Sequence, residues 1–206
     1  MPRLIYQPQN DPENYHYFNN AFSKEEIKKV ISDCDSLPDV NRATTEDGEQ
    51  KSEDGGLART SMIKWIPETE KWHWLYDKLL DLAIKANKEK WRFDLVSSLE
   101  LIQYTEYHAS ECGQYDWHQD VGEGDLQSKR KVSITVQLSD DDEYEGGEFM
   151  ILKGGSGTGK LENFYTCPRN KGNVIIFPSY KVHRVAPVTK GVRKSLVLWI
   201  GGSHFR

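Results

Sequence analysis

Apolar spacing divides the chain into a helical N-terminal part and a longer part of short strands. Residues 23–26 have the pattern of a capping box, in which Ser23 and Glu26 satisfy each other's backbone N–H groups, and predict a helix to about Cys34. Pro67 predicts the start of a longer helix that runs to about Lys90. Its apolar residues recur at helical spacing, which predicts a face packed against a sheet: Trp72, Leu75, Leu79, Leu82, Ala83 and Ala86.

The segment between these helices, residues 39–60, is charged, contains glycine and has little apolar content. It predicts a loop, and the two interpretations are a solvated surface loop or a lid over bound substrate. From Trp91 onward, short apolar or alternating runs separated by turns predict a mainly β core. With no internal repeat or linker, we expect one domain over residues 1–206, with helical support over about 1–90 and the core over about 91–206.

Two of the expected strands carry polar residues of interest. Residues 172–179 predict a turn followed by a buried strand, and residues 192–200 alternate so that Arg193, Ser195, Val197 and Trp199 share one face. An arginine in an apolar strand is costly to bury without an anionic partner. Its guanidinium can bind a ligand carboxylate bidentately or form a structural salt bridge, and the residues leave both interpretations open.

Two histidines and an aspartate are candidate metal ligands. His118 and Asp120 lie two residues apart at the expected end of a strand, where their side chains would share a face, and His183 follows the buried strand. Two imidazoles and one carboxylate form the ligand set of non-haem Fe(II) oxygenases and leave coordination positions open. Zinc would occupy the same set, and among six histidines a coincidental His-x-Asp string is the bland alternative.

A glycine-rich string at residues 154–160 matches the G-x-x-x-x-G-K pattern of a phosphate-binding loop. Leu161 stands where that loop requires serine or threonine, and residues 161–168 predict a strand where a helix should begin. We therefore interpret the string as a flexible hairpin loop.

The composition of this 206-residue chain indicates which partners and which compartment to expect. A formal net charge of −5 gives no general attraction to nucleic acid or to membranes. Three scattered cysteines favour a reducing compartment over a disulfide framework. With no signal peptide or long apolar stretch in the sequence, we expect a soluble cytoplasmic protein.

The segment from about Leu99 to Gly201 resembles the 2-oxoglutarate and Fe(II)-dependent dioxygenases, in particular their prolyl 4-hydroxylase-like branch. The stretch between Tyr104 and His118 is longer than the link common in prolyl hydroxylases. The matching motifs follow in family order: Tyr104, residues 118–120, residues 144–149, residues 172–179 and residues 183–193.

The resemblance implies a cofactor set and site residues. Fe(II) would be held by His118, Asp120 and His183, the distal carboxylate of the co-substrate 2-oxoglutarate would pair with Arg193, and O₂ would complete the reaction. Ascorbate is a candidate further cofactor. Along residues 131–138, Gln137 is the side chain expected to reach the co-substrate carboxylate. The other residues expected to line the pocket are Tyr104, Val185, Ser195 and Trp199.

The resemblance also implies a mainly β fold with N-terminal helices, a double-stranded β-helix or jelly roll of the cupin-like kind. Two sheets closed face to face would bring the distant ligands together.

Three functions compete on this basis. The first is hydroxylation of a C–H bond, of a prolyl residue in a protein or peptide, with release of succinate and CO₂. The second is oxidation of a small molecule or a nucleic-acid base. A nucleic-acid partner is disfavoured because demethylases of this superfamily carry a second arginine six residues after the first, where this chain has Trp199. The third, a non-catalytic jelly-roll binding protein, is disfavoured by the complete set of three ligands and Arg193.

Overall fold

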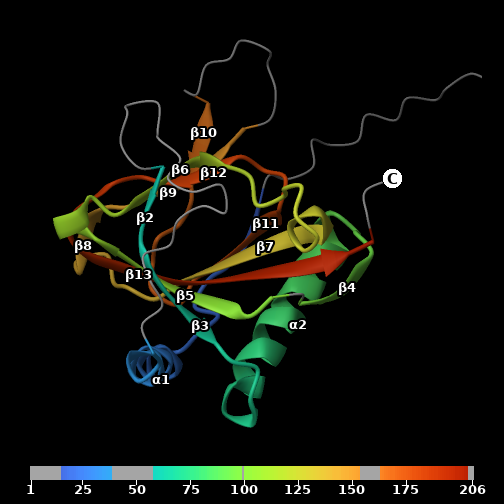
Figure 1. Ribbon diagram of the computed structural model, residues 1–206, viewed down its shortest axis with the longest axis horizontal. Helices are drawn as coiled ribbons and strands as arrows, with labels where there is room; N and C mark the ends of the chain where they lie inside the picture. Colours follow the sequence, from blue (N-terminus) through green and yellow to red (C-terminus); the bar gives the residue numbers. More distant parts are fainter. Residues whose placement is uncertain (1–14, 39–57, 99, 154–162, 204–206) are drawn as a thin grey trace, which may run out of the picture.

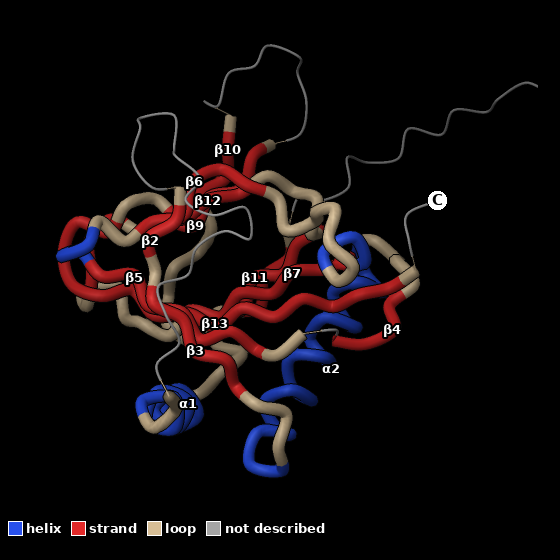
Figure 2. Tube along the Cα trace, in the orientation of Figure 1, coloured by secondary structure: helices blue, strands red, loops and turns tan. Residues whose placement is uncertain are grey.

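Two antiparallel sheets lie face to face, and two helices pack against the larger one (Figures 1 and 2). The computed structural model describes residues 15–38, 58–98, 100–153 and 163–203. In order, the major sheet contains β1 (His16–Phe18), β11 (Val174–Pro178), β7 (Arg130–Gln137), β13 (Val188–Gly202), β5 (Ile102–His108) and β3 (Met62–Ile66), while β4 (Leu95–Ser98) and β8 (Tyr144–Gly146) also pair with β13. The minor sheet contains β10 (Phe164–Thr166), β9 (Phe149–Leu152), β12 (His183–Val185), β6 (Gln114–His118) and β2 (Arg59–Thr60). This arrangement is the predicted jelly roll.

The helices and short 3₁₀ turns complete the fold. Helix α1 and helix α2 both lie on the side of the major sheet that faces away from the minor sheet (Figure 2). Within the described ranges, no helix is long and apolar enough to cross a membrane. The bounds are α1 (Lys24–Asp35), α2 (His73–Lys90), η1 (Glu70–Trp72), η2 (Ala109–Glu111) and η3 (Gln127–Lys129).

The capping box that the sequence predicts is present at the start of α1. The Glu26 backbone N–H donates to Ser23 Oγ (3.2 Å), and the Ser23 backbone N–H donates to Glu26 Oε2 (2.7 Å). Helix α1 then buries Ile27, Val30 and Cys34. Two otherwise unpaired backbone donors are thus satisfied where the helix begins.

Replacing Ser23 with alanine should lower the free energy of unfolding by about 1 kcal/mol, because the Glu26 N–H loses its acceptor. Chemical denaturation of the whole protein measures this change. Ser32→Ala, on the exposed side of the same helix, is the matched control and should change stability much less. Equal stabilities for Ser23→Ala and the unmodified protein would show that the cap contributes nothing.

Helix α2 begins later than predicted. We expected Pro67 to open it, but a 3₁₀ turn over Glu70–Trp72 comes first and the α-helix starts at His73. Residue Thr69 is extended (φ −121°, ψ 163°), and its N–H bonds to Pro67 O (2.9 Å), so the chain turns tightly before it can become helical. The predicted apolar stripe packs against the sheet as expected, with Leu82 partly buried and the rest buried.

The N-terminal third contributes strands that the sequence did not indicate. β1 extends the major sheet beside β11, β3 pairs with β5, and β2 pairs with β6 of the minor sheet. The expected division at about residue 90 is therefore wrong, because residues before it also supply strands to both sheets. The expected loop is wrong at residues 59–60, which form β2. The remainder of that loop, residues 39–57, and the hairpin at residues 154–160 lie outside the described residues. β10 falls within the strand predicted for residues 161–168.

Two apolar clusters hold the layers together. One joins the helices to the major sheet, where Tyr76 of α2 donates its hydroxyl to Ile66 O (2.7 Å) and accepts from Ile102 N–H (3.0 Å). The other lies between the two sheets and includes Phe149, Phe177 and Val185. The three cysteines are free thiols.

Candidate metal and co-substrate site

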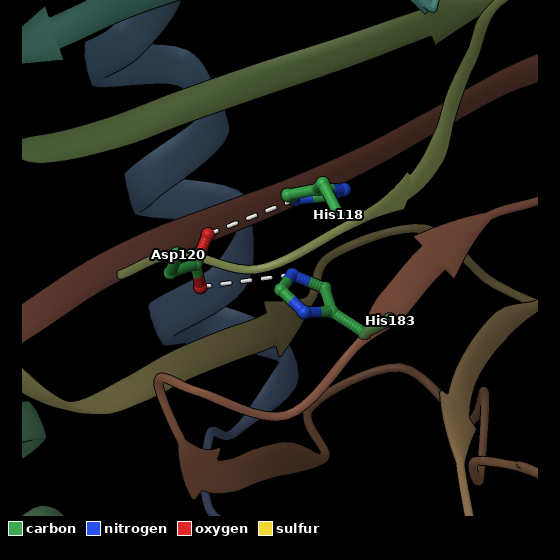
Figure 3. A group of neighbouring side chains, drawn as sticks. All are labelled: His118, Asp120 and His183. Atoms are coloured by element: carbon green, nitrogen blue, oxygen red, sulfur yellow. Dashed lines mark ion pairs between the residues drawn. The ribbon is translucent and has the colours of Figure 1, made fainter. Parts of the chain in front are cut away.

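Three predicted ligands converge between the two sheets (Figure 3). His118 ends β6, and His183 begins β12 directly opposite it in the antiparallel pair. Asp120 follows two residues after His118. The Nε2 atom of His118 lies 3.7 Å from Asp120 Oδ1, and the Nε2 atom of His183 lies 3.6 Å from Asp120 Oδ2. The candidate ligand atoms all lie within 4.8 Å of one another, so one ion can contact all three.

Both imidazoles are held with Nε2 directed to the centre of this group. Nδ1 of His118 lies 2.7 Å from Asp116 O, and Nδ1 of His183 lies 2.8 Å from Lys181 O. Since a carbonyl only accepts, each Nδ1 carries the proton and each Nε2 keeps its lone pair for a metal. Burial, aided by the neighbouring His183, lowers the pKa of His118 to about 3, so this imidazole is neutral at neutral pH.

Asp120 is held as a carboxylate by its surroundings. Burial raises the pKa of Asp120, whereas the hydrogen bond from the Ser133 hydroxyl and the nearby positive charge of Arg130 lower it, and the net pKa lies below the usual value. Ser133 donates to Asp120 Oδ2 (2.6 Å). The backbone is fixed as well, because Asp120 N–H donates to Ser179 O (3.0 Å) and Arg130 donates to Asp120 O (3.0 Å).

Replacing Ser133 with alanine should weaken metal affinity by about 10–100-fold, because the carboxylate of Asp120 loses the hydroxyl that orients it. Competition of the apoprotein with a chelator for Fe(II) measures the dissociation constant. The control is Ser97→Ala on the exposed side of β4, which should leave it unchanged. An unaltered metal affinity in Ser133→Ala would show that the backbone contacts alone position Asp120.

A cavity opens from these three residues into the space between the sheets. Four residues of β13 that the sequence places on one face, Arg193, Ser195, Val197 and Trp199, all line it. The other lining residues are Arg59, Gln103, Tyr107, Tyr115, Ile134, Thr135, Phe149, Phe177 and Val185, together with the three ligands.

Arg193 lies in this cavity without a counter-ion. Its side chain is 1% exposed and donates to Gln137 Oε1 (3.0 Å) and Ser195 Oγ (3.3 Å). No carboxylate of the described residues pairs with it, which disfavours the structural salt bridge. Arg193 Nε and Gln137 Nε2 are both buried with no acceptor in the described part of the chain. An anion with several acceptor oxygens would compensate the charge and satisfy both donors.

Two of the predicted pocket residues take other positions. Tyr104 lies on the opposite face of β5, in the core beneath the major sheet, where its hydroxyl donates to Glu106 Oε1 (2.8 Å). The expectation that Tyr104 lines the pocket is therefore wrong, and Tyr107 and Gln103 of the same strand line it instead. Gln137 is behind Arg193 and holds its guanidinium. Side chains alternate between the two faces of β5, so Tyr104 cannot share a face with Gln103 and Tyr107. The prediction placed Tyr104 on the cavity face, whereas it lies on the opposite one.

Sequence reasoning also missed Tyr115 and Arg59, two of the other residues that line the cavity. Tyr115 stacks on the ring of His118, with centroids 3.4 Å apart and planes 11° apart, and Arg59 reaches the cavity from β2. The position of Tyr115, three residues before His118, suggests the outer face by simple alternation. An irregularity in the pairing of β6 with β12 turns it inward.

Known proteins are similar to this chain in sequence and in fold. A family model described as the 2OG-Fe(II) oxygenase superfamily matches residues 102–201. A PKHD-type hydroxylase from Synechococcus sp. is 37% identical over 108 residues, which cover 52% of this chain and 45% of that protein. Residues 102–201 therefore have the sequence of the 2OG-Fe(II) oxygenase superfamily. The match spans less than half the length of the curated relative.

Solved structures of two prolyl hydroxylases have a similar fold. A prolyl-4-hydroxylase from Pseudomonas putida superposes with a TM-score of 0.64 at 16% identity, covering 92% of this chain and 93% of that one. A prolyl hydroxylase from Trichoplax adhaerens, in complex with a hypoxia inducible factor peptide fragment, gives a TM-score of 0.66 at 16% identity and covers 92% and 84% of the two chains. At this identity the likeness shows the fold alone.

The superfamily implies Fe(II), 2-oxoglutarate and O₂, and the residues present fit them. Two imidazoles and a carboxylate match the ligands that non-haem Fe(II) takes. The buried Arg193, whose Nε–H and the neighbouring Gln137 Nε2 have no acceptor among the described residues, matches a carboxylate of the co-substrate.

Proposed function

We propose that this protein is a dioxygenase that hydroxylates a C–H bond, in a prolyl residue of a peptide or protein. One oxygen atom of O₂ enters the hydroxyl group, and the other enters the succinate formed when 2-oxoglutarate loses CO₂. The observation that carries the proposal is the buried Arg193, which faces the same cavity as the three candidate ligands and lacks a counter-ion among the described residues. A metal site alone would not require such a cation.

The polar residues in and around the cavity would bind the metal and the co-substrate. His118, Asp120 and His183 would hold Fe(II), which when bound supplies the redox chemistry that activates O₂. Arg193, held by Gln137, would orient the co-substrate by its distal carboxylate, with Ser195 as a further polar contact.

The apolar wall of the cavity would keep water from the reacting groups. Phe149 and Phe177 pack beside the ring of His183, with centroids 5.6 and 4.7 Å away, and Val185 completes this side. A dry cavity strengthens the charge pairing of Arg193 with the co-substrate.

The substrate class rests on the relatives. The Synechococcus relative is a PKHD-type hydroxylase, the Pseudomonas putida structure is a prolyl-4-hydroxylase, and the Trichoplax enzyme holds a peptide fragment. We extend the prolyl and peptide assignment to this chain, with ascorbate as an accessory reductant that keeps the iron in its Fe(II) state.

The first test is a visible absorption spectrum of the anaerobic protein, recorded with Fe(II) and again after 2-oxoglutarate is added. A new metal-to-ligand charge-transfer band on the second addition supports chelation of the co-substrate by bound iron. Absence of the band in folded, iron-loaded protein would refute the dioxygenase.

The second test identifies the substrate. Proline-containing peptides are compared with the same peptides carrying alanine in place of proline, and with free proline. Peptide hydroxylation is read by mass spectrometry as the gain of one oxygen atom. Turnover of free proline alone would assign the protein to small-molecule oxidation.

A further inference from the structure

We propose that Arg59 binds a carboxylate group of the substrate beside the metal centre, so that the substrate is an acid. The inference rests on the proposed function and specifies its substrate class. Arg59 opens β2 (Figure 1), a strand of two residues that pairs with β6. In this pairing Arg59 lies directly opposite Tyr115. Its side chain is half-buried and lines the same cavity as the candidate metal ligands.

Arg59 is connected to the metal centre through stacked rings. Its guanidinium carbon lies 4.8 Å from the centroid of the Tyr115 ring, and that ring stacks on the imidazole of His118. The Arg59 Nε–H donates to Ser61 Oγ (2.9 Å). One end of the guanidinium is therefore held in place, next to a residue that contacts a candidate ligand.

The other donors of Arg59 have no acceptor among the described residues, and no described carboxylate lies within ion-pair distance. Two other arginines of the described residues do have an ion-pair partner. Arg130 forms an ion pair with Glu100, and Arg169 with Asp141. A guanidinium with free Nη donors presents the planar fork that matches a carboxylate.

The charges in the cavity favour an anionic substrate. When the charges of Fe(II), 2-oxoglutarate, Asp120, Arg193 and Arg59 are added, one positive charge remains in the described part of the cavity. Arg59 is the cation to which neither the metal centre nor the co-substrate assigns a partner. The net charge of the whole chain is −5, so the attraction for an acid is local to this cavity. Arg59 and Arg193 belong to different sheets, so Arg59 can bind the substrate while Arg193 binds the co-substrate.

Acetate is the first probe, because it carries only the group that Arg59 would recognise. The full chain is loaded with Zn(II) and 2-oxoglutarate, and the Nε–H signal of Arg59 is followed by NMR and assigned by its loss in Arg59→Gln. We expect a saturable shift with acetate and none with acetamide or with chloride at equal ionic strength. No shift, or the same shift with chloride, would overturn the proposal.

Two ligand pairs then distinguish the sources of the carboxylate. N-acetyl-L-proline against its amide represents a small acid, and acetyl-Pro-Glu-amide against acetyl-Pro-Gln-amide represents an acidic peptide. In at least one pair the acid should bind about tenfold more tightly or better, which corresponds to about 1.4 kcal/mol. Arg59→Gln should abolish this preference, and Arg59→Lys should restore part of it.

The matched control is Arg184→Gln. It removes the same charge from the minor sheet, but Arg184 lies 4.9 Å from the Trp117 ring and does not line the cavity. It should keep the preference for acids. An acid preference that survives in Arg59→Gln, or is absent from both pairs, would overturn the proposal and leave Arg59 as a structural partner of Tyr115. The charge-transfer band tests the proposed function separately, so failure of one is distinguishable from failure of the other.

Discussion

His183→Ala is expected to abolish Fe(II)-dependent turnover of 2-oxoglutarate while leaving the fold largely intact. The imidazole is 5% exposed, and its Nε2 is one of only three candidate ligand atoms in the group. Loss of a partner that merely orients a ligand costs about 10–100-fold in affinity or activity, so loss of a direct ligand should cost more. Succinate formation measures turnover, and chelator competition measures Fe(II) affinity.

An exposed histidine provides the control for this substitution. His73→Ala, at the start of α2, removes the same side chain far from the cavity residues and should leave turnover and metal affinity unchanged. Circular dichroism and thermal unfolding confirm that each variant folds. Full activity in a folded His183→Ala protein would contradict the ligand assignment.

Arg193→Ala is expected to raise the KM for 2-oxoglutarate far more than it weakens Fe(II) binding. Removing one partner of a buried, hydrogen-bonded charge pair costs about 2–5 kcal/mol, which corresponds to an increase of about 30-fold or more. The ligand atoms of the metal group are unchanged in this variant. Steady-state kinetics at several co-substrate concentrations, with Fe(II) affinity measured separately, resolve the two effects.

A second variant distinguishes a co-substrate contact from a structural ion pair. Arg193→Met keeps much of the volume and removes the charge. If Arg193 has no counter-ion in the apoprotein, this change should not lower the free energy of unfolding, whereas breaking a buried ion pair costs about 3–5 kcal/mol. The stabilisation that 2-oxoglutarate confers on the metal-loaded protein should be lost. A strongly destabilised Arg193→Met apoprotein with an unchanged KM would identify a structural pair.

Local patterns in the sequence determined much of the fold and the candidate site. The short spacing of His118 and Asp120, at the end of β6 and just beyond it, placed these two ligands together, and the two-residue period of a strand placed Arg193 and Trp199 on one face of β13. The capping box located the start of α1. Each of these inferences depends on residues close in the chain, where backbone geometry alone relates one side chain to the next.

Tertiary structure decided the features that depend on pairing between distant segments. The register of β12 against β6 sets His183 opposite His118, and an irregularity in that pairing turns Tyr115 inward. Tyr104 and Tyr107 lie on opposite faces of β5, and only the packing of that strand determines which face meets the cavity. A shift of one residue in the register of β5 would turn the Tyr104 face towards the cavity and the Tyr107 face away from it.

The partners of the two cavity arginines were also decided only in three dimensions. Whether Arg193 meets a carboxylate depends on every chain segment packed around it, and the described segments provide none. Arg59 reaches the cavity from β2, a strand too short to give a periodic pattern in the sequence. This strand forms by pairing with the edge of β6. The sequence alone therefore determined which residues carry chemistry on each strand, and long-range packing decided which of them meet.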